Sequence, residues 1–224
     1  MAIHNQLNDL TRESISEMMT AIDHCILFKK DNAWKTKGGI LGVPTTILLF
    51  SIVDAIGSYY ARTEKKFPIK GSKPKSINNT RDHFYVLNGE LFGQTLSKGE
   101  LDILYQQYRN KLTHNLALSA FYFLEIGNDG QSFFEKTSIG TSNYYSLRIK
   151  PFYQIVQNGV NTFLPILDQV LDSSDTKQNR ISKSDLFVPP IPDFSDKHFD
   201  PKAYIEVHPT GTTQTIQIVG PKRD

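Results

Sequence analysis

The residues whose types and spacing best suit acid–base chemistry lie in one stretch, Tyr108-Arg109-Asn110-Lys111-Leu112-Thr113-His114-Asn115. This stretch places an arginine, an amide and a histidine inside a segment that otherwise has the apolar pattern of a buried helix. An arginine stabilises the negative charge that develops on a phosphodiester, and a histidine transfers protons near neutral pH. Arg109, Asn110 and His114 are therefore the candidate catalytic residues. Tyr108 and Lys111 are the candidate substrate contacts, although a tyrosine at helical spacing is more often a core residue.

A single helix over about residues 98–126 is predicted to position these side chains. Ser97 and Glu100 have the spacing of a capping box at its start, and Gly127 supplies a stop signal. At ~100° per residue, Asn110 and His114 share a face, so we expect the amide to orient the imidazole. Arg109 lies ~140° around the helix from His114, so one straight helix does not direct both at the same phosphate. Both sides of this helix carry apolar groups, which predicts a second cover such as a twofold dimer partner.

The stretch resembles the Arg-x4–6-His motif of the HEPN superfamily, in which a polar residue commonly follows the arginine. Here Arg109 is followed by Asn110, and four residues separate Arg109 from His114. The resemblance implies a helical bundle, mainly over residues 45–172, that forms a homodimer in which two motifs share one cleft. It also implies a metal-independent endoribonuclease of a bacterial toxin or antiviral defence system, in which the RNA 2′-hydroxyl attacks the adjacent phosphate. His114 would transfer protons, Arg109 would stabilise the scissile phosphate, and Asn110 would support the site.

A noncatalytic HEPN-like binding or scaffold module is the alternative that the motif leaves open. In that interpretation His114 is a core histidine hydrogen-bonded to Asn110 or Asn115, and Arg109 is a surface cation. The same helix face would serve dimerisation, and a C-terminal hairpin would engage a protein partner such as an antitoxin or a regulatory protein. The net charge of +2, from 25 Lys and Arg against 23 Asp and Glu, indicates no broad nucleic-acid-binding surface.

The remaining chain is predicted to surround this helix with further helices and two hairpins. The predicted fold class is mostly α, a HEPN-like helical bundle over residues 1–172 with a short β-hairpin insertion. A polar, proline-containing linker over residues 173–202 and a C-terminal hairpin appendage over residues 203–224 follow. Helices are expected at about residues 8–30, 44–62, 80–91 and from Pro151 onward, with hairpins at residues 133–149 and 203–219.

Composition narrows the setting and the chemistry. Cys25 is the only cysteine, which excludes an intramolecular disulfide and a zinc site made of several thiolates, and fits a reducing, cytoplasmic setting. The six histidines form no close pair at metal-ligand spacing, so no metal or cofactor is expected. The chain begins without the basic and apolar regions of a signal peptide. Pro44, Ser51 and Asp54 interrupt the apolar run of residues 40–60, which favours a core helix over a membrane span.

Three other groups of polar residues each have two interpretations. Asp54 lies in the apolar second helix, and a buried carboxylate needs a partner, for which Arg109 or another cation is expected to act as a structural clamp. Lysines recur through residues 65–75, where a solvated basic loop is the commoner interpretation and contact with a phosphate backbone is the alternative. The run Arg81-Asp82-His83 is better explained as a capped first turn than as a catalytic grouping, because neighbours in a helix do not share a face.

Overall fold

The computed structural model describes residues 7–35, 38–171, 205–210 and 213–218. Two units are distinguished, residues 2–187 and, together with residue 1, residues 188–224. In the second unit, strands β6 (Ile205–Thr210) and β7 (Thr213–Ile218) pair antiparallel, which confirms the predicted C-terminal hairpin. The predicted linker over residues 173–202 lies outside the described residues.

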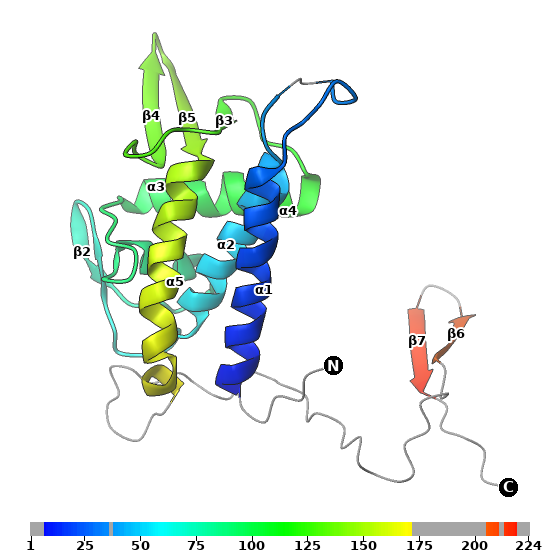
Figure 1. Cartoon of the computed structure of the whole chain (residues 1–224). Helices are drawn as coiled ribbons and strands as arrows, with labels where there is room; N and C mark the ends of the chain where they lie inside the picture. The colour runs from blue at the N-terminus through cyan, green and yellow to red at the C-terminus, as the bar shows by residue number, and fades with distance from the viewer. Residues whose placement is uncertain (1–6, 36–37, 172–204, 211–212, 219–224) are drawn as a thin grey trace, which may run out of the picture. The chain divides into compact units, whose positions relative to one another are not determined.

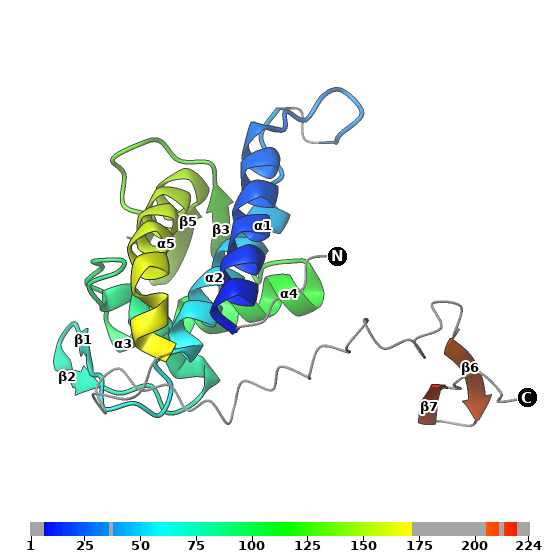
Figure 2. The ribbon, with the colours of Figure 1, turned by 60° about the horizontal axis from the view of Figure 1, so that its bottom comes forward.

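Three long helices form the centre of the first unit. Helix α2 (Gly42–Ser58) packs against both α1 (Leu7–Leu27) and α5 (Ile149–Leu171), and α1 and α5 also contact each other (Figures 1 and 2). Phe50 of α2 marks the middle of the core, where its ring lies 5.4 Å from that of Phe84 and 4.8 Å from that of Phe152. The predicted helix with Pro151 in its first turn is confirmed as α5.

Helix α2 is buried along most of its length, and its polar residues near the start are satisfied internally. Thr45 and Thr46 are fully buried, and their hydroxyls donate to the carbonyl oxygens of Leu41 and Gly42 at 2.7 and 2.8 Å. These bonds remove the cost of burying two hydroxyl groups. Within the described part of the chain, no helix is long and apolar enough to cross a membrane.

A small hairpin and a 3-10 helix follow α2. Strands β1 (Phe67–Ile69) and β2 (Ser72–Lys75) pair antiparallel, and the 3-10 helix η1 (Thr80–Asn88) comes next. The predicted third helix is therefore present, with Asn79 as its cap, but it ends earlier and is wound more tightly than expected. At its end the Asn88 amide donates to the carbonyl oxygens of Pro68 and Leu96, which ties η1 to the hairpin.

The prediction of one helix over residues 98–126 is wrong. The segment is α-helical in α3 (Lys98–Ile103), π-helical in η2 (Leu104–Asn110) and α-helical again in α4 (Lys111–Asn115). Its start is as predicted, because Ser97 and Glu100 form a complete capping box. It ends at Leu116, which adopts a left-handed conformation with φ of 53°.

A three-stranded sheet takes the place of the last turns of that predicted helix. Its order is β3 (Tyr122–Glu125), β5 (Ser142–Arg148), β4 (Phe134–Ile139), with β4 antiparallel and β3 parallel to β5. The β4–β5 pair confirms the predicted internal hairpin, and Figure 1 shows it projecting beyond the helices. With three small sheets beside the helices among the described residues, the fold is mixed α/β, so the predicted mostly-α bundle is wrong.

Candidate functional site

Asp54 lies at the centre of a cluster of polar side chains drawn from three elements. One of its carboxylate oxygens, Oδ2, accepts a hydrogen bond from Arg109 Nη2 at 2.8 Å, at the end of η2. The other, Oδ1, lies 2.7 Å from Nδ1 of His83 in η1. The structure thus confirms the predicted clamp between Asp54 and Arg109. It adds His83 as a second partner, so that both carboxylate oxygens are used.

The Arg109 guanidinium is fixed by further contacts on its own helix. Its Nη1 donates to the side-chain oxygen of Asn110 at 3.0 Å, and its guanidinium carbon lies 5.8 Å from the centre of the Tyr105 ring. The Arg109 side chain is 26% exposed, compared with 15% for Asp54, so the guanidinium sits at the edge of the protein rather than in its core. Because these contacts already restrict the Arg109 side chain, little conformational freedom remains that a bound anion would have to remove.

The three consecutive residues Arg81, Asp82 and His83 contact three different partners. Arg81 pairs with Asp102 of α3, and the backbone N–H of Asp82 donates to the capping side chain of Asn79. Only His83 reaches Asp54. The predicted capped turn is therefore correct for Asp82, but that prediction missed His83. The one sequence signal that pointed to it was the unpaired carboxylate expected in α2, because nothing in the local pattern links residues 29 positions apart.

His114 lies on α4, one helical turn beyond Asn110, and its side chain is exposed. The described hydrogen bond of the Asn110 side chain goes to Arg109, whereas we predicted that this amide would orient His114. The π-helical winding ends at Asn110, so nearly all of the path from Arg109 to His114 is ordinary α-helix. The two side chains consequently diverge, as the helical geometry predicts, with Arg109 directed to α2.

Tyr108 and Lys111, the candidate substrate contacts, differ in accessibility. Tyr108 is fully buried, and its hydroxyl donates to the carbonyl oxygens of Phe123 and Tyr145 at 3.2 and 2.8 Å. Burial raises the pKa of this tyrosine, so the hydroxyl stays protonated and keeps donating to the sheet. Tyr108 is thus a core residue that joins η2 to the sheet, and the prediction that it contacts substrate is wrong. Lys111 is partly exposed at the start of α4.

Apolar side chains remain exposed near the end of α4. Leu116 is 69% exposed, Phe121 48% and Phe123 46%, while the Phe121 and Tyr144 rings lie 5.4 Å apart. The predicted continuous face that would have joined His114 to Phe121 does not exist, because α4 ends before residue 117. Exposed apolar side chains follow His114 in the chain nonetheless, so the expectation of a second cover still has a physical basis.

The described residues offer no metal site beside the Asp54 cluster. Among them, no group of three or more His, Cys, Asp and Glu side chains is placed to hold a metal ion.

Comparisons of the chain with protein-family models, with curated proteins and with solved structures found no match.

Proposed function

We propose that this chain is a metal-independent endoribonuclease whose reactive groups are Arg109, Asn110 and His114. The observation that carries the proposal is the 2.8 Å ion pair with Asp54, which fixes a partly exposed guanidinium two residues from α4. A guanidinium has five N–H donors, and among the described residues two of them are hydrogen-bonded. Three donors therefore remain for the oxygens of a phosphodiester, and the exposed His114 lies on the same helical segment.

The proposed reaction needs two proton transfers and stabilisation of charge on phosphorus. One group accepts the proton of the 2′-hydroxyl as its oxygen bonds to phosphorus. A second group gives a proton to the 5′-oxygen as the phosphorus–oxygen bond to it breaks. The products are a 2′,3′-cyclic phosphate and a free 5′-hydroxyl. Arg109 would neutralise the non-bridging oxygens. Because Arg109 and His114 of one chain diverge, His114 of the partner subunit in a homodimer would carry one of the two proton transfers.

His83 is suited to the other proton transfer. A carboxylate accepts hydrogen bonds, so Asp54 favours the tautomer of His83 in which Nδ1 carries the proton and Nε2 can accept one. The exposed Leu116, Phe121 and Phe123 offer an apolar surface for the homodimer that would bring the partner's His114 to this site. We propose the homodimer as the active form, acting on RNA in the cytoplasm in a toxin or antiviral role under a regulatory protein.

The test is cleavage of a mixed-sequence RNA in excess EDTA by the full chain and its variants. Arg109→Ala and His114→Ala should each reduce the rate by ~100-fold or more while leaving the fold intact. His24→Ala is the matched control, because His24 is also an exposed histidine on a helix, and it should cleave at the unmodified rate. Products ending in 2′,3′-cyclic phosphate are expected. Cleavage by His114→Ala at the unmodified rate would overturn the assignment.

The exposed apolar side chains also favour a second candidate, a noncatalytic dimeric binding or scaffold module. In this alternative Arg109 serves only as the clamp on Asp54, and the surface around Leu116 and Phe123 is the interface. Well-folded dimeric protein that leaves RNA intact would support it. Deleting residues 203–224 should then abolish capture of a protein partner without unfolding the first unit, and unchanged capture would count against a role for the hairpin.

A further inference from the structure

Positive charge is concentrated in one short segment of the chain, residues 62–75. The segment contains six cations, Arg62, Lys65, Lys66, Lys70, Lys73 and Lys75, and one carboxylate, Glu64, for a net charge of +5. Since the whole chain has a net charge of +2, everything outside the segment sums to −3. The modest overall charge therefore hides a local cationic surface on an otherwise slightly acidic protein.

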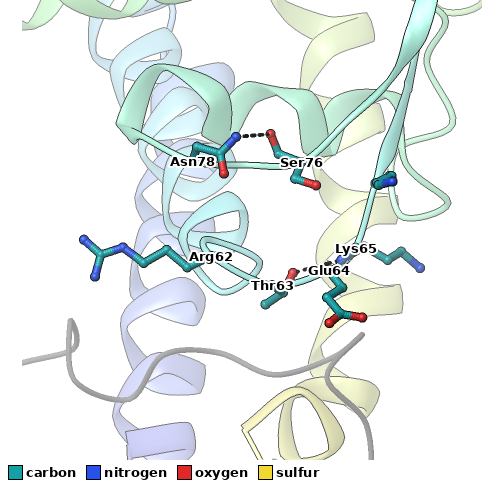
Figure 3. Close-up of a pocket in the computed structure, with 7 residues that line it drawn as sticks. Arg62, Thr63, Glu64, Lys65, Ser76 and Asn78 are labelled. Carbon is teal, nitrogen blue, oxygen red and sulfur yellow. Dashed lines mark hydrogen bonds between the residues drawn. The ribbon is translucent and has the colours of Figure 1, made fainter.

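A pocket of about 820 Å³ lies at the base of this segment (Figure 3). One wall is formed by residues 62–66 and the other by Ser76 and Asn78, which follow β2. Three lining side chains are cationic, those of Arg62, Lys65 and Lys66, and the other polar groups are hydroxyls, an amide and the Glu64 carboxylate. This combination of cations, hydroxyls and an amide is the set that binds phosphate oxygens in proteins.

The backbone around the pocket is held in place rather than left as a free loop. Arg62 adopts a left-handed conformation, with φ of 59°, which costs free energy for a residue other than glycine. Its N–H donates to the carbonyl oxygen of Ile77 at 2.9 Å, and Ala61 forms a bridge with the same residue. Thr63 is buried, and its hydroxyl donates to the carbonyl oxygen of Tyr60 at 2.8 Å. The two walls are therefore joined by hydrogen bonds and keep a fixed separation.

We propose that this pocket binds the phosphate backbone of a single RNA strand, with Lys65 and Lys66 as its main phosphate contacts. The lysines of the β1–β2 hairpin continue beyond the pocket at Lys70, Lys73 and Lys75, and only an extended polyanion makes use of such a series. A small phosphorylated ligand would fill the pocket and leave these lysines unused. The choice of RNA rests on the proposed function, whereas the phosphate chemistry follows from the pocket alone.

The pocket and the candidate site share their supporting elements. Asp54 lies four residues before the end of α2, about 6 Å along the helix axis, and Arg62 follows just after that end. On the other wall, Asn78 is followed by η1, which carries His83. A strand held in the pocket would therefore be attached to the same two elements that position the Asp54 cluster. In this arrangement the pocket supplies affinity, and Arg109 and His114 supply the chemistry.

Binding of a short, fluorescently labelled single-stranded RNA to the full chain tests this proposal. All proteins carry His114→Ala, so that cleavage does not obscure binding. The measured quantity is the slope of the logarithm of the binding constant against the logarithm of the salt concentration. Each lysine–phosphate contact contributes ~0.7 to this slope, so Lys65→Ala/Lys66→Ala should lower its magnitude by ~1.4. The parent protein, which carries only His114→Ala, should then lose about sevenfold more affinity than this variant between about 50 and 200 mM salt. The matched control is Lys136→Ala/Lys150→Ala, two exposed lysines outside the segment, and it should keep the parent slope.

Each outcome of this experiment decides something different. Equal slopes for the two double variants would overturn the proposal, provided that both unfold at the same urea concentration as the parent. If heparin displaces the labelled RNA as effectively as unlabelled RNA does at the same concentration of negative charge, the choice of RNA would be overturned. Lysine-dependent RNA binding, together with no RNA cleavage by the chain that keeps His114, would leave the pocket proposal standing and refute the nuclease. If the chain that keeps His114 cleaves RNA, and Lys65→Ala/Lys66→Ala in that chain does not slow cleavage at low RNA concentration, the nuclease would stand and the pocket proposal would be refuted.

Discussion

The ion pair between Asp54 and Arg109 gives a quantitative prediction about stability. A hydrogen bond to a charged group contributes roughly 1.5–3 kcal/mol, and a fully exposed ion pair less than about 1 kcal/mol. The two side chains are 15% and 26% exposed, which places this pair between those limits. We expect a coupling free energy of ~1.5 kcal/mol between them.

A double-mutant cycle measures that coupling directly. The free energy of unfolding is determined by urea titration for the unmodified protein, Asp54→Ala, Arg109→Ala and the double variant. Asp54→Ala should be the more damaging single change, at about 3 kcal/mol, because it removes the partner of Arg109 and of His83 at once. For a unit of this size that loss lowers the melting temperature by roughly 9 °C.

An exposed pair on α3 provides the control cycle. Lys98 and Asp102 lie 2.6 Å apart at i, i+4, but their side chains are 43% and 22% exposed, so their coupling should stay below ~0.5 kcal/mol. A coupling for Asp54 and Arg109 as small as this control would refute the reasoning. It would mean that Arg109 gains nothing measurable from the carboxylate and that the cluster is not held by it.

Two further changes test the packing and the ionisation of this region. Gly57→Ala should destabilise the protein by ~1–3 kcal/mol in urea titrations, because the new Cβ would lie 2.3 Å from the carbonyl oxygen of His83. Gly99→Ala, where nothing lies within 4 Å of the new Cβ, should cost nothing, and equal losses would contradict the argument. Burial, and then the charge of Glu90, raises the pKa of Tyr60 to about 12. The neutral hydroxyl therefore stabilises the fold below pH ~10, and up to ~3 kcal/mol is lost as the pH rises from about 10 to 12. Tyr60→Phe should flatten that decline in unfolding free energy, and an unchanged pH dependence would refute it.

Elements with strong local signals could be predicted from the sequence. The capping box at Ser97 and the proline in the first turn of α5 each specify a helix start within a few residues. The β4–β5 hairpin was also predictable, because segments with aromatic and apolar residues flank a short polar turn, in which Gly140 adopts positive φ. In these places the residues that determine the structure are neighbours in the chain.

The end of the Arg109 helix could not be predicted in this way. No glycine or proline occurs between Gly99 and Gly127, so nothing local indicated a stop at Leu116. The apolar residues at 121–124 fit a helical stripe as well as a short strand. They form β3 because Tyr122 and Leu124 pair in parallel with β5, more than twenty residues later in the chain. Pairing over that distance overrides a local pattern that suits both structures.

The candidate site shows the same division between local and distant signals. The ion pair of Asp54 could be predicted, because a carboxylate in an apolar helix requires a cation, and Arg109 is that cation. His83 was missed, since its role depends on how closely η1 approaches α2 at Gly57, which no local pattern indicates. The motif residues alone therefore predicted the arginine and the exposed histidine, but not the group that completes the cluster.

The two interpretations of Arg109 predict opposite rankings for the same two variants. If Arg109 serves only as a clamp, Asp54→Ala is at least as damaging as Arg109→Ala in every assay, because Asp54 holds two partners and Arg109 holds one carboxylate. If Arg109 faces a phosphate, the ranking by stability is unchanged, but the ranking by cleavage rate is reversed. Arg109→Ala then removes the charge that acts in the transition state, whereas Asp54→Ala leaves Arg109 and His83 in the protein and only loosens both of them. A reversal between the two assays cannot come from loss of folding, since the less stable variant would be the more active one.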